Sequence, residues 1–188
     1  DVYKRQGIAE LRELGVLPQA SWYEDVDCIY ISHMHLDHLG ALSNIPLETK
    51  LRLPDLPLYN MLEERWRSSP TWLSLIPRKY YVEVEEIKPC EVDENNVVAL
   101  PVSHSACPAY AFLYFGDDKT ILYTGDFRDE SFLSKDDFLA LNKGVDMLTY
   151  LRENKDIRID LLIVEGTNIG SSRPPITPSE TVRHLRRL

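Results

Sequence analysis

Three of the five histidines in this chain fall within residues 33–38, which read His-Met-His-Leu-Asp-His. Residues two apart in an extended segment point to the same side, so His33 and His35 can reach one cation together. Asp37 has the same parity and His38 points away, so a turn there could bring Asp37 and His38 to a second cation. Imidazole nitrogens and carboxylate oxygens are ligands that Zn²⁺, Mn²⁺ and Fe²⁺ all accept. The alternative, exposed loop histidines without a shared role, requires an uncommon chance clustering.

Two further candidate ligands follow apolar runs later in the chain. His104 comes after residues 97–100, and Asp126 lies within residues 123–128, which read Tyr-Thr-Gly-Asp-Phe-Arg. Taken alone, a histidine at a strand end is more often a hydrogen-bonding residue, and Gly-Asp is a common turn. Beside the histidine cluster, we interpret His104 as the third protein ligand of the first cation. We interpret Asp126 as a carboxylate that bridges both cations.

This ligand set predicts a hydrolase that uses two divalent metal ions, with zinc first and manganese or iron as alternatives. A water held by such ions has a pKa lowered toward neutrality, so a metal-activated hydroxide forms at working pH. Two cations about 3.5–4 Å apart can also share the charge that develops on the attacked group. We count Asp37 and Asp126 among the catalytic residues. No serine or cysteine nucleophile is indicated, because there is no GxSxG motif and Cys107 has no evident base partner apart from the candidate ligands.

The elements that must position these residues begin with a helix and a strand. Helical spacing of apolar residues predicts a helix that starts near Ile8 and stops at Gly15. Residues 28–31 form a β-rich run, which we interpret as a buried strand directly before the histidine cluster. Residues 55–67 are expected to be helical. The residues expected on one apolar face of that helix are Leu58, Met61 and Leu62.

The second half of the chain is richer in strands. Apolar runs at residues 96–101, 109–115 and 120–124, with Gly and Asp between the last two, predict hairpin-connected strands. A helix is expected from Ser134, whose hydroxyl can cap it, and residues 160–164 are expected to form another buried strand. The residues expected to face inward from the helix are Phe138, Leu141, Val145 and Leu148. Strands and helices mixed in this way predict an α/β layered domain.

Composition places the chain among globular proteins. Its 188 residues suffice for one domain, with 44% hydrophobic and 27% charged residues and no apolar run long enough to span a membrane. The net charge of −9 argues against a broad nucleic-acid footprint. It does not exclude a nucleic-acid substrate, because two divalent cations in a cleft would make the local field positive. The three widely spaced cysteines, Cys28, Cys90 and Cys107, are interpreted as packing residues and suit a cytoplasmic location.

Three segments resemble successive motifs of the metallo-β-lactamase superfamily: residues 32–38, 103–105 and 124–128. The resemblance covers roughly residues 25–170. It implies a metallo-β-lactamase αββα sandwich, incomplete at its N-terminal end, with two metal ions between the sheets. Within the superfamily, Ser103 stands where lactamases, lactonases and glyoxalase-type thioesterases usually have glycine.

The β-CASP nucleases, and ribonuclease J-like enzymes in particular, are the branch that the chain resembles most. Residues 104–110 lead into an apolar strand as in that branch, and residues 124–128 and 164–168 are similar to it. DNA-crosslink-repair nucleases share the general pattern, but the Glu-Gly-Thr-Asn stretch is closer to the RNA-processing members. Glu165 matches an acidic motif residue of the branch, which implies a catalytic part for it through orienting a metal-binding histidine. The alternative for Glu165 is a surface residue at a strand end.

The chain is expected to be partial. Residues 1–175 would be the metallo-β-lactamase-type domain, lacking strands that usually precede the first motif, and residues 176–188 the start of a truncated β-CASP-type domain. Residues 177–180 read Thr-Pro-Ser-Glu, a helix-opening signature with Thr as cap, Pro first and Glu reaching back. On that helix, His184 is interpreted as a solvated residue and not as a ligand.

These observations together predict a ribonuclease that hydrolyses RNA phosphodiester bonds, with exonucleolytic cleavage as one mode. RNA is the expected partner, no membrane is involved, and a homo-oligomer of the full-length protein stays open. The alternatives are a small-molecule hydrolase of the lactonase or thioesterase type, and a non-catalytic RNA-binding homologue.

Overall fold

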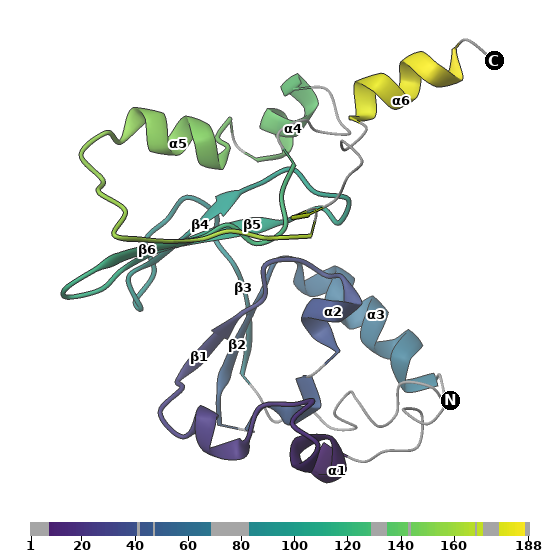
Figure 1. The fold of residues 1–188 in the computed structure, drawn as a ribbon, viewed down its shortest axis with the longest axis vertical. Helices are drawn as coiled ribbons and strands as arrows, with labels where there is room; N and C mark the ends of the chain where they lie inside the picture. The colour runs from purple at the N-terminus through teal and green to yellow at the C-terminus, as the bar shows by residue number, and fades with distance from the viewer. Residues whose placement is uncertain are drawn as a thin grey trace. The chain divides into compact units, whose positions relative to one another are not determined.

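The structure is a computed structural model that describes residues 8–40, 42–46, 48–68, 83–128, 135–142, 144–167, 169–170 and 177–186. The chain divides into two compact units, Asp1–Ile87 and Lys88–Leu188. Each unit carries one β-sheet among helices, which confirms the predicted α/β class (Figure 1). No helix within the described residues is long and apolar enough to cross a membrane.

The first unit is built on a three-stranded parallel sheet in the order β1-β2-β3. Its strands are β1 (Cys28–Tyr30), β2 (Lys50–Leu53) and β3 (Val84–Glu86). Its helices are α1 (Ile8–Glu13), α2 (Leu36–Leu39) and α3 (Leu56–Ser68), with short 3₁₀ turns at Ala20–Tyr23 and Leu42–Asn44. The core of the unit joins α2, β2 and α3, because Leu39, Leu53 and Tyr59 are almost fully buried in one cluster.

Two expectations about the first unit need correction. The strand β1 is half-buried and not buried, since all three of its residues have intermediate exposure. In α3, Met61 is 50% exposed whereas Tyr59 is 1% exposed. At about 100° per residue, Met61 lies about 200° around the helix from Tyr59, so the two cannot share one face. The inward face therefore includes Tyr59, with the predicted Leu58 and Leu62 on one side of it and Leu56 on the other.

The second unit is built on a four-stranded sheet in the order β4-β5-β6-β7. Its strands are β4 (Val97–Pro101), β5 (Tyr110–Phe115), β6 (Thr120–Tyr123) and β7 (Leu161–Ile163). Strands β4, β5 and β6 run antiparallel, which confirms the predicted hairpins, and β7 is parallel to β6. Apolar residues of β4, β5 and β6 form the core, on which Met147 of helix α5 (Met147–Glu153) packs.

The helical segment after β6 also differs from expectation. Instead of one helix there are two, α4 (Lys135–Leu141) and α5, while the expected cap Ser134 lies outside the described residues. Gly144, with a φ of 84°, interrupts the helical backbone between α4 and α5. The Asp146 side chain then caps the start of α5 by accepting a hydrogen bond from the Thr149 amide at 2.7 Å. The break changes the helical phase. Within α4, Phe138 is buried and Leu141 is exposed, and after the break Val145 is half-buried and Leu148 is exposed.

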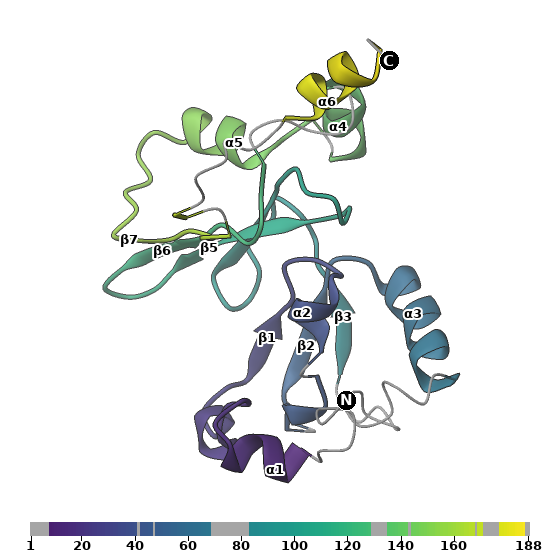
Figure 2. The ribbon, with the colours of Figure 1, turned by 45° about the vertical axis from the view of Figure 1, so that its right-hand side comes forward.

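Strand β7 is exposed, whereas a buried strand was predicted there. The side chains of residues 161–164 are between 45% and 54% exposed. The physical reason is packing: β7 lies at one end of the described sheet, beside β6 (Figure 2), and none of its residues belongs to the core cluster that β4, β5 and β6 form, whereas β4 at the other end does belong to that cluster and is buried. An apolar run alone cannot distinguish an edge strand from a central one.

Two further expectations concern the C-terminal helix and the cysteines. Helix α6 (Pro178–Leu185) opens with the predicted capping box, in which Thr177 accepts from the Glu180 amide and Glu180 accepts from the Thr177 amide. Residues 171–176, at the predicted domain boundary, lie outside the described residues. Cys28 and Cys90 are half-buried, but Cys107 is exposed, so the packing interpretation is wrong for Cys107.

Candidate metal site

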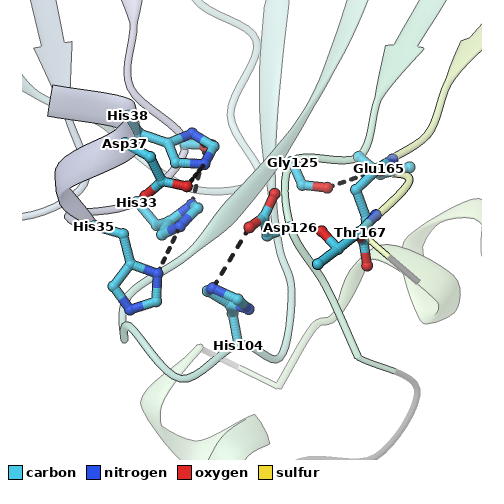
Figure 3. A network of polar contacts seen from close by, with 11 residues as sticks. His33, His35, Asp37, His38, His104, Gly125, Asp126, Glu165 and Thr167 are labelled. Carbon is cyan, nitrogen blue, oxygen red and sulfur yellow. Dashed lines mark hydrogen bonds and ion pairs between the residues drawn. The ribbon is translucent and has the colours of Figure 1, made fainter. Parts of the chain in front are cut away.

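The first set of candidate ligands lies where the chain leaves β1. The Ile31 amide still bonds to the Arg52 carbonyl of β2 at 2.9 Å; the chain then bends at His33, and the backbone of His35 is extended, with φ −72° and ψ 151°. The rings of His33 and His35 lie next to each other, as predicted, although the bend at His33 means that the chain between them is not a regular strand. His33 Nε2 and His35 Nδ1 are 3.0 Å apart (Figure 3).

This pair of ring nitrogens fits a cation. Two nitrogen ligands at 2.0–2.1 Å from a tetrahedral Zn²⁺ are about 3.4 Å apart, close to the separation between His33 Nε2 and His35 Nδ1. His33 is fully buried, and two neighbouring apolar residues are part of the core: Met34, between His33 and His35, and Leu39, directly after His38. The two rings are thus held by packed neighbours, which is the support that a metal site requires.

Asp37 and His38 follow in the first turn of α2. The predicted turn is present, because α2 starts at Leu36 directly after His35. It brings the His38 ring to a centroid distance of 4.0 Å from the His33 ring. His38 Nε2 is 3.8 Å from the nearer Asp37 oxygen, and the Asp37 side chain is 77% exposed against 20% for His38. One imidazole and one open carboxylate thus lie next to the His33–His35 pair.

Ser32 is part of this cluster, although the sequence analysis assigned it no role. Its Oγ is 3.1 Å from His33 Nδ1 and 3.3 Å from His38 Nδ1, and the residue is 3% exposed. The signal in the sequence was a small hydroxyl residue at the end of a strand, directly before a ligand. That signal is weak alone, because serine at a strand end is common.

The second set of candidate ligands lies on loops of the second unit. After β4, the Ser103 carbonyl accepts a hydrogen bond from the Arg128 amide at 2.8 Å, which forms an isolated antiparallel bridge between these residues. The bridge brings the loop that follows β4 beside the loop that follows β6. His104 Nε2 consequently lies 3.8 Å from an Asp126 oxygen (Figure 3), and both side chains are largely buried.

Thr124 connects the Asp126 loop to the segment that follows β7. The buried Thr124 hydroxyl donates to the Gly125 carbonyl at 2.8 Å and accepts from the Glu165 amide at 3.4 Å. The Thr124 amide also bonds to the Ile163 carbonyl at 3.0 Å, which continues the pairing of β6 with β7. Gly125 has a φ of 57°, a left-handed conformation that glycine adopts without steric cost. Thr124, like Ser32, was not among the residues predicted from the sequence to belong to the site.

Glu165 is held as a carboxylate by its own loop. The pKa of Glu165 is lowered, first by the side-chain and backbone hydrogen bonds from Thr167, while desolvation opposes the shift. The Thr167 amide donates to Glu165 Oε2 at 3.0 Å. The positive charges of His104 and Arg128 lower the pKa further. A negative group near His104 suits the predicted role of Glu165 in orienting that histidine.

The predicted site residues therefore occur in two sets. The first unit brings together His33, His35 and His38, with Asp37 beside His38. The second unit brings together His104 and Asp126, with the ionised Glu165 acting on His104. That both sets share one pair of cations remains a prediction. His184 is exposed on α6, which agrees with its interpretation as a solvated residue.

Known proteins with similar sequences include two nucleases by name. The 5′ exonuclease Apollo of Rattus norvegicus is 32% identical over 131 residues, which cover 63% of this chain and 21% of Apollo. Probable RNase MJ4 of Methanocaldococcus jannaschii is 28% identical over 166 residues, which cover 80% of this chain and 36% of that protein. The chain thus spans between about a fifth and a third of the length of these relatives. No protein-family model matches the chain.

Solved structures extend the similarity to the fold. A protein of unknown function from Enterococcus faecalis V583 aligns with a TM-score of 0.59 at 24% identity, over 85% of this chain and 38% of its own. Unliganded yeast PDE1 aligns with a TM-score of 0.54 at 19% identity, over 91% of this chain and 55% of its own. At these identities the likeness concerns the fold alone.

Proposed function

Because this chain has an α/β metallo-β-lactamase-like fold with two sheets and its distant homologues are β-CASP nucleases, we propose that it is a metal-dependent ribonuclease. The observation that carries the proposal is the His33–His35 pair, with ring nitrogens 3.0 Å apart beside His38. Such a pair is suited to a cation and is built into a rigid core.

The two ligand sets would form one site. A catalytic zinc ion usually has three protein ligands and one open position, and the His33–His35 pair supplies only two. His104 would complete the first cation site. Asp37 and His38 would hold the second cation, and Asp126, 3.8 Å from His104, would bridge the two. Neither set alone has enough ligands for two cations, whereas the two sets together have the ligands that a dinuclear metal site of a hydrolase needs.

Divalent cations held there would supply a nucleophilic water and would stabilise the negative charge on the attacked phosphate. The side chains have tasks of their own. Asp37, which is 77% exposed, can accept the proton that an attacking water loses. Glu165 would keep the His104 ring in the orientation and tautomer that a ligand needs.

RNA is the substrate that we propose. Probable RNase MJ4 aligns over 80% of this chain, a larger share than the 63% covered by the rat exonuclease. The net charge of −9 means that a polyanion would be attracted by the metal site and not by the whole surface. A phosphodiester is also the group whose charge two cations stabilise best.

The test is cleavage by the full-length protein with added Zn²⁺ or Mn²⁺. Its substrates are a 5′-monophosphate RNA labelled at either end, the DNA of the same sequence, and a panel of lactones and thioesters. We expect RNA cleavage that stops on chelation and in the His35→Ala variant. Faster cleavage of the DNA would favour a deoxyribonuclease, and turnover of only the small molecules would reject the nuclease proposal. Binding of RNA without any cleavage would favour a non-catalytic homologue.

A further inference from the structure

One buried hydroxyl contacts two candidate ligands that are assigned to different cations. Ser32 Oγ lies 3.1 Å from His33 Nδ1 and 3.3 Å from His38 Nδ1. Both contacts are made with Nδ1 of the ring. The other nitrogen, Nε2, lies 3.0 Å from His35 Nδ1 in His33 and 3.8 Å from an Asp37 oxygen in His38. Ser32 itself is 3% exposed, so water competes little for these bonds.

The proton positions that this arrangement favours follow from hydrogen-bond chemistry. A serine oxygen has two lone pairs and can accept from two N–H groups, but it has only one proton to donate. Two arrangements therefore satisfy both contacts: Oγ accepts from Nδ1–H of both rings, or it accepts from one ring and donates to the other, and only the first leaves both Nε2 atoms without a proton. Each Nε2 is then an unprotonated lone pair, the form of imidazole that binds a metal ion.

The contact between His33 and His35 agrees with this assignment. With the proton of His33 on Nδ1, His33 Nε2 is an acceptor, and His35 Nδ1 can donate to it across the 3.0 Å that separates them. The opposite tautomer of His33 would place a proton on the atom that should bind the cation. Hydrogen bonds at the ring nitrogen that is not a ligand commonly fix the tautomer in metal sites.

We propose that Ser32 is a positioning residue, whose hydroxyl holds His33 and His38 in the tautomer that leaves Nε2 of both rings available for cations. The proposal rests on the proposed function, because it gives the two histidines a common metal-binding task. One side chain thereby prepares ligands of both cation positions. Ser32 acts only through the two histidines and does not itself contact substrate.

The first measurement needs no metal. Long-range ¹H–¹⁵N spectra of the metal-free protein at alkaline pH report which ring nitrogen carries the proton. We expect His33 and His38 to be protonated at Nδ1 in the wild type, and the Ser32→Ala variant to show a mixture of tautomers for both. A wild-type spectrum with the proton on Nε2 of either ring would overturn the proposal, as would a Ser32→Ala spectrum equal to that of the wild type.

The second measurement is Zn²⁺ affinity by competition with a chromophoric chelator. Loss of the outer hydrogen-bond partner of a ligand typically weakens metal binding about 10- to 100-fold, and we expect a decrease of this size in Ser32→Ala. Ser32→Thr retains the hydroxyl and should restore both the affinity and the tautomers. If the added methyl group prevents Ser32→Thr from folding, the comparison of Ser32→Ala with the wild type still decides.

Thr49→Val is the matched control, since it removes another buried hydroxyl of the same unit, away from the histidines. It should leave the tautomers and the Zn²⁺ affinity unchanged, and an equal effect of both variants would reduce Ser32 to a packing role. If the wild type binds no divalent cation, the proposed function fails, while the metal-free spectra still decide on Ser32. If the wild type binds Zn²⁺ and cleaves RNA but Ser32→Ala behaves identically, only the inference about Ser32 fails.

Discussion

In the first unit, His33, His35 and His38 come from one short segment, whereas in the second unit His104 and Asp126 come from loops separated by a β-hairpin. The three histidines of the first unit, which we call the local set, are arranged by the backbone of a few consecutive residues, with a bend at His33, an extended His35 and a helix directly after it. The distant set depends on the register of a whole sheet and on the bridge between Ser103 and Arg128. Candidate metal ligands are thus positioned by local backbone conformation in the first unit and by the pairing of distant segments in the second.

The hydroxyl groups that support the two sets differ in the same way. Ser32 contacts ring nitrogens of the candidate ligands, while Thr124 contacts the Gly125 carbonyl and the Glu165 amide. In the local set, consecutive residues fix the backbone, so Ser32 has only the orientation of the histidine rings left to determine. In the distant set the loops themselves must be held together. Variants at the two kinds of position should therefore fail differently.

The largest effects are expected in the local set. His33→Ala and His35→Ala should both abolish metal binding and cleavage, because each removes one of two neighbouring ligands. Only His33→Ala should also lower the stability of the metal-free protein, since His33 is fully buried and His35 is half-exposed. Removing a large buried side chain typically costs about 2–5 kcal/mol. Metal content, cleavage rate and urea unfolding of the metal-free variants measure these three properties.

Equal stability of the two metal-free variants would contradict this distinction. A His35→Ala variant that still binds Zn²⁺ and cleaves RNA would remove His35 from the ligand set. His184→Ala is a suitable control, because His184 is exposed on α6 and outside both ligand sets. It should retain wild-type metal content.

A smaller loss is expected from Asp126→Asn in the distant set. The amide has nearly the same volume as the carboxylate but lacks its charge, so it cannot bridge two cations effectively. His33, His35 and His104 would still hold one ion. We therefore expect the metal content to fall from two ions to one and cleavage to be strongly reduced, measured by metal analysis of protein dialysed against trace Zn²⁺. Two ions retained in the variant would show that Asp126 is not a bridging ligand.

The difference between the two sets also decides what the sequence can reveal. The parity of His33 and His35, the turn at Asp37 and the capping box at Thr177 were predictable, because each depends on a few consecutive residues. The candidate residues His104 and Asp126 were found from their places after strands. Their 3.8 Å separation, however, depends on the sheet register.

The errors have the same origin. The exposure of β7 reflects that its residues lie outside the core cluster of the second unit, and an apolar run does not encode which elements will pack on it. The split between α4 and α5 depended on Gly144, a residue that helices tolerate at a cost and that periodicity alone overlooks. Ser32 and Thr124 escaped notice because their roles consist of contacts, which residue type and spacing do not reveal.

Thr124→Val tests whether the distant set depends on its backbone frame. Valine is close to threonine in shape but leaves the Gly125 carbonyl and the Glu165 amide without the hydroxyl, and an unsatisfied buried group costs about 1–3 kcal/mol. We expect lower stability and a loss of cleavage smaller than in Asp126→Asn. Hydrogen exchange at the Glu165 amide should become faster, while the ring signals of His33 and His38 stay unchanged. Thr124→Ser keeps the hydroxyl and should resemble the wild type. Unchanged exchange at Glu165 in Thr124→Val would disprove the connection.

The smallest effect concerns Glu165, whose pKa is lowered by hydrogen bonds from Thr167 in its own loop. Thr167→Ala should raise the pKa of Glu165 only part of the way to its usual value, because the side-chain hydrogen bond is lost but the Thr167 amide still donates. A carboxyl group with a lowered folded-state pKa contributes stability above its unfolded-state pKa and loses that contribution as the pH falls through the folded-state value. The variant should therefore be slightly less stable than the wild type at neutral pH, and the free energies of unfolding of the two proteins should converge in acid.

Carbon-detected titration of Glu165 measures the pKa directly, with Thr167→Ser as the variant that keeps the hydroxyl. If Glu165 titrates alike in Thr167→Ala and the wild type, the Thr167 hydroxyl does not lower its pKa, and the Thr167 amide together with the charges of His104 and Arg128 would account for the lowered value.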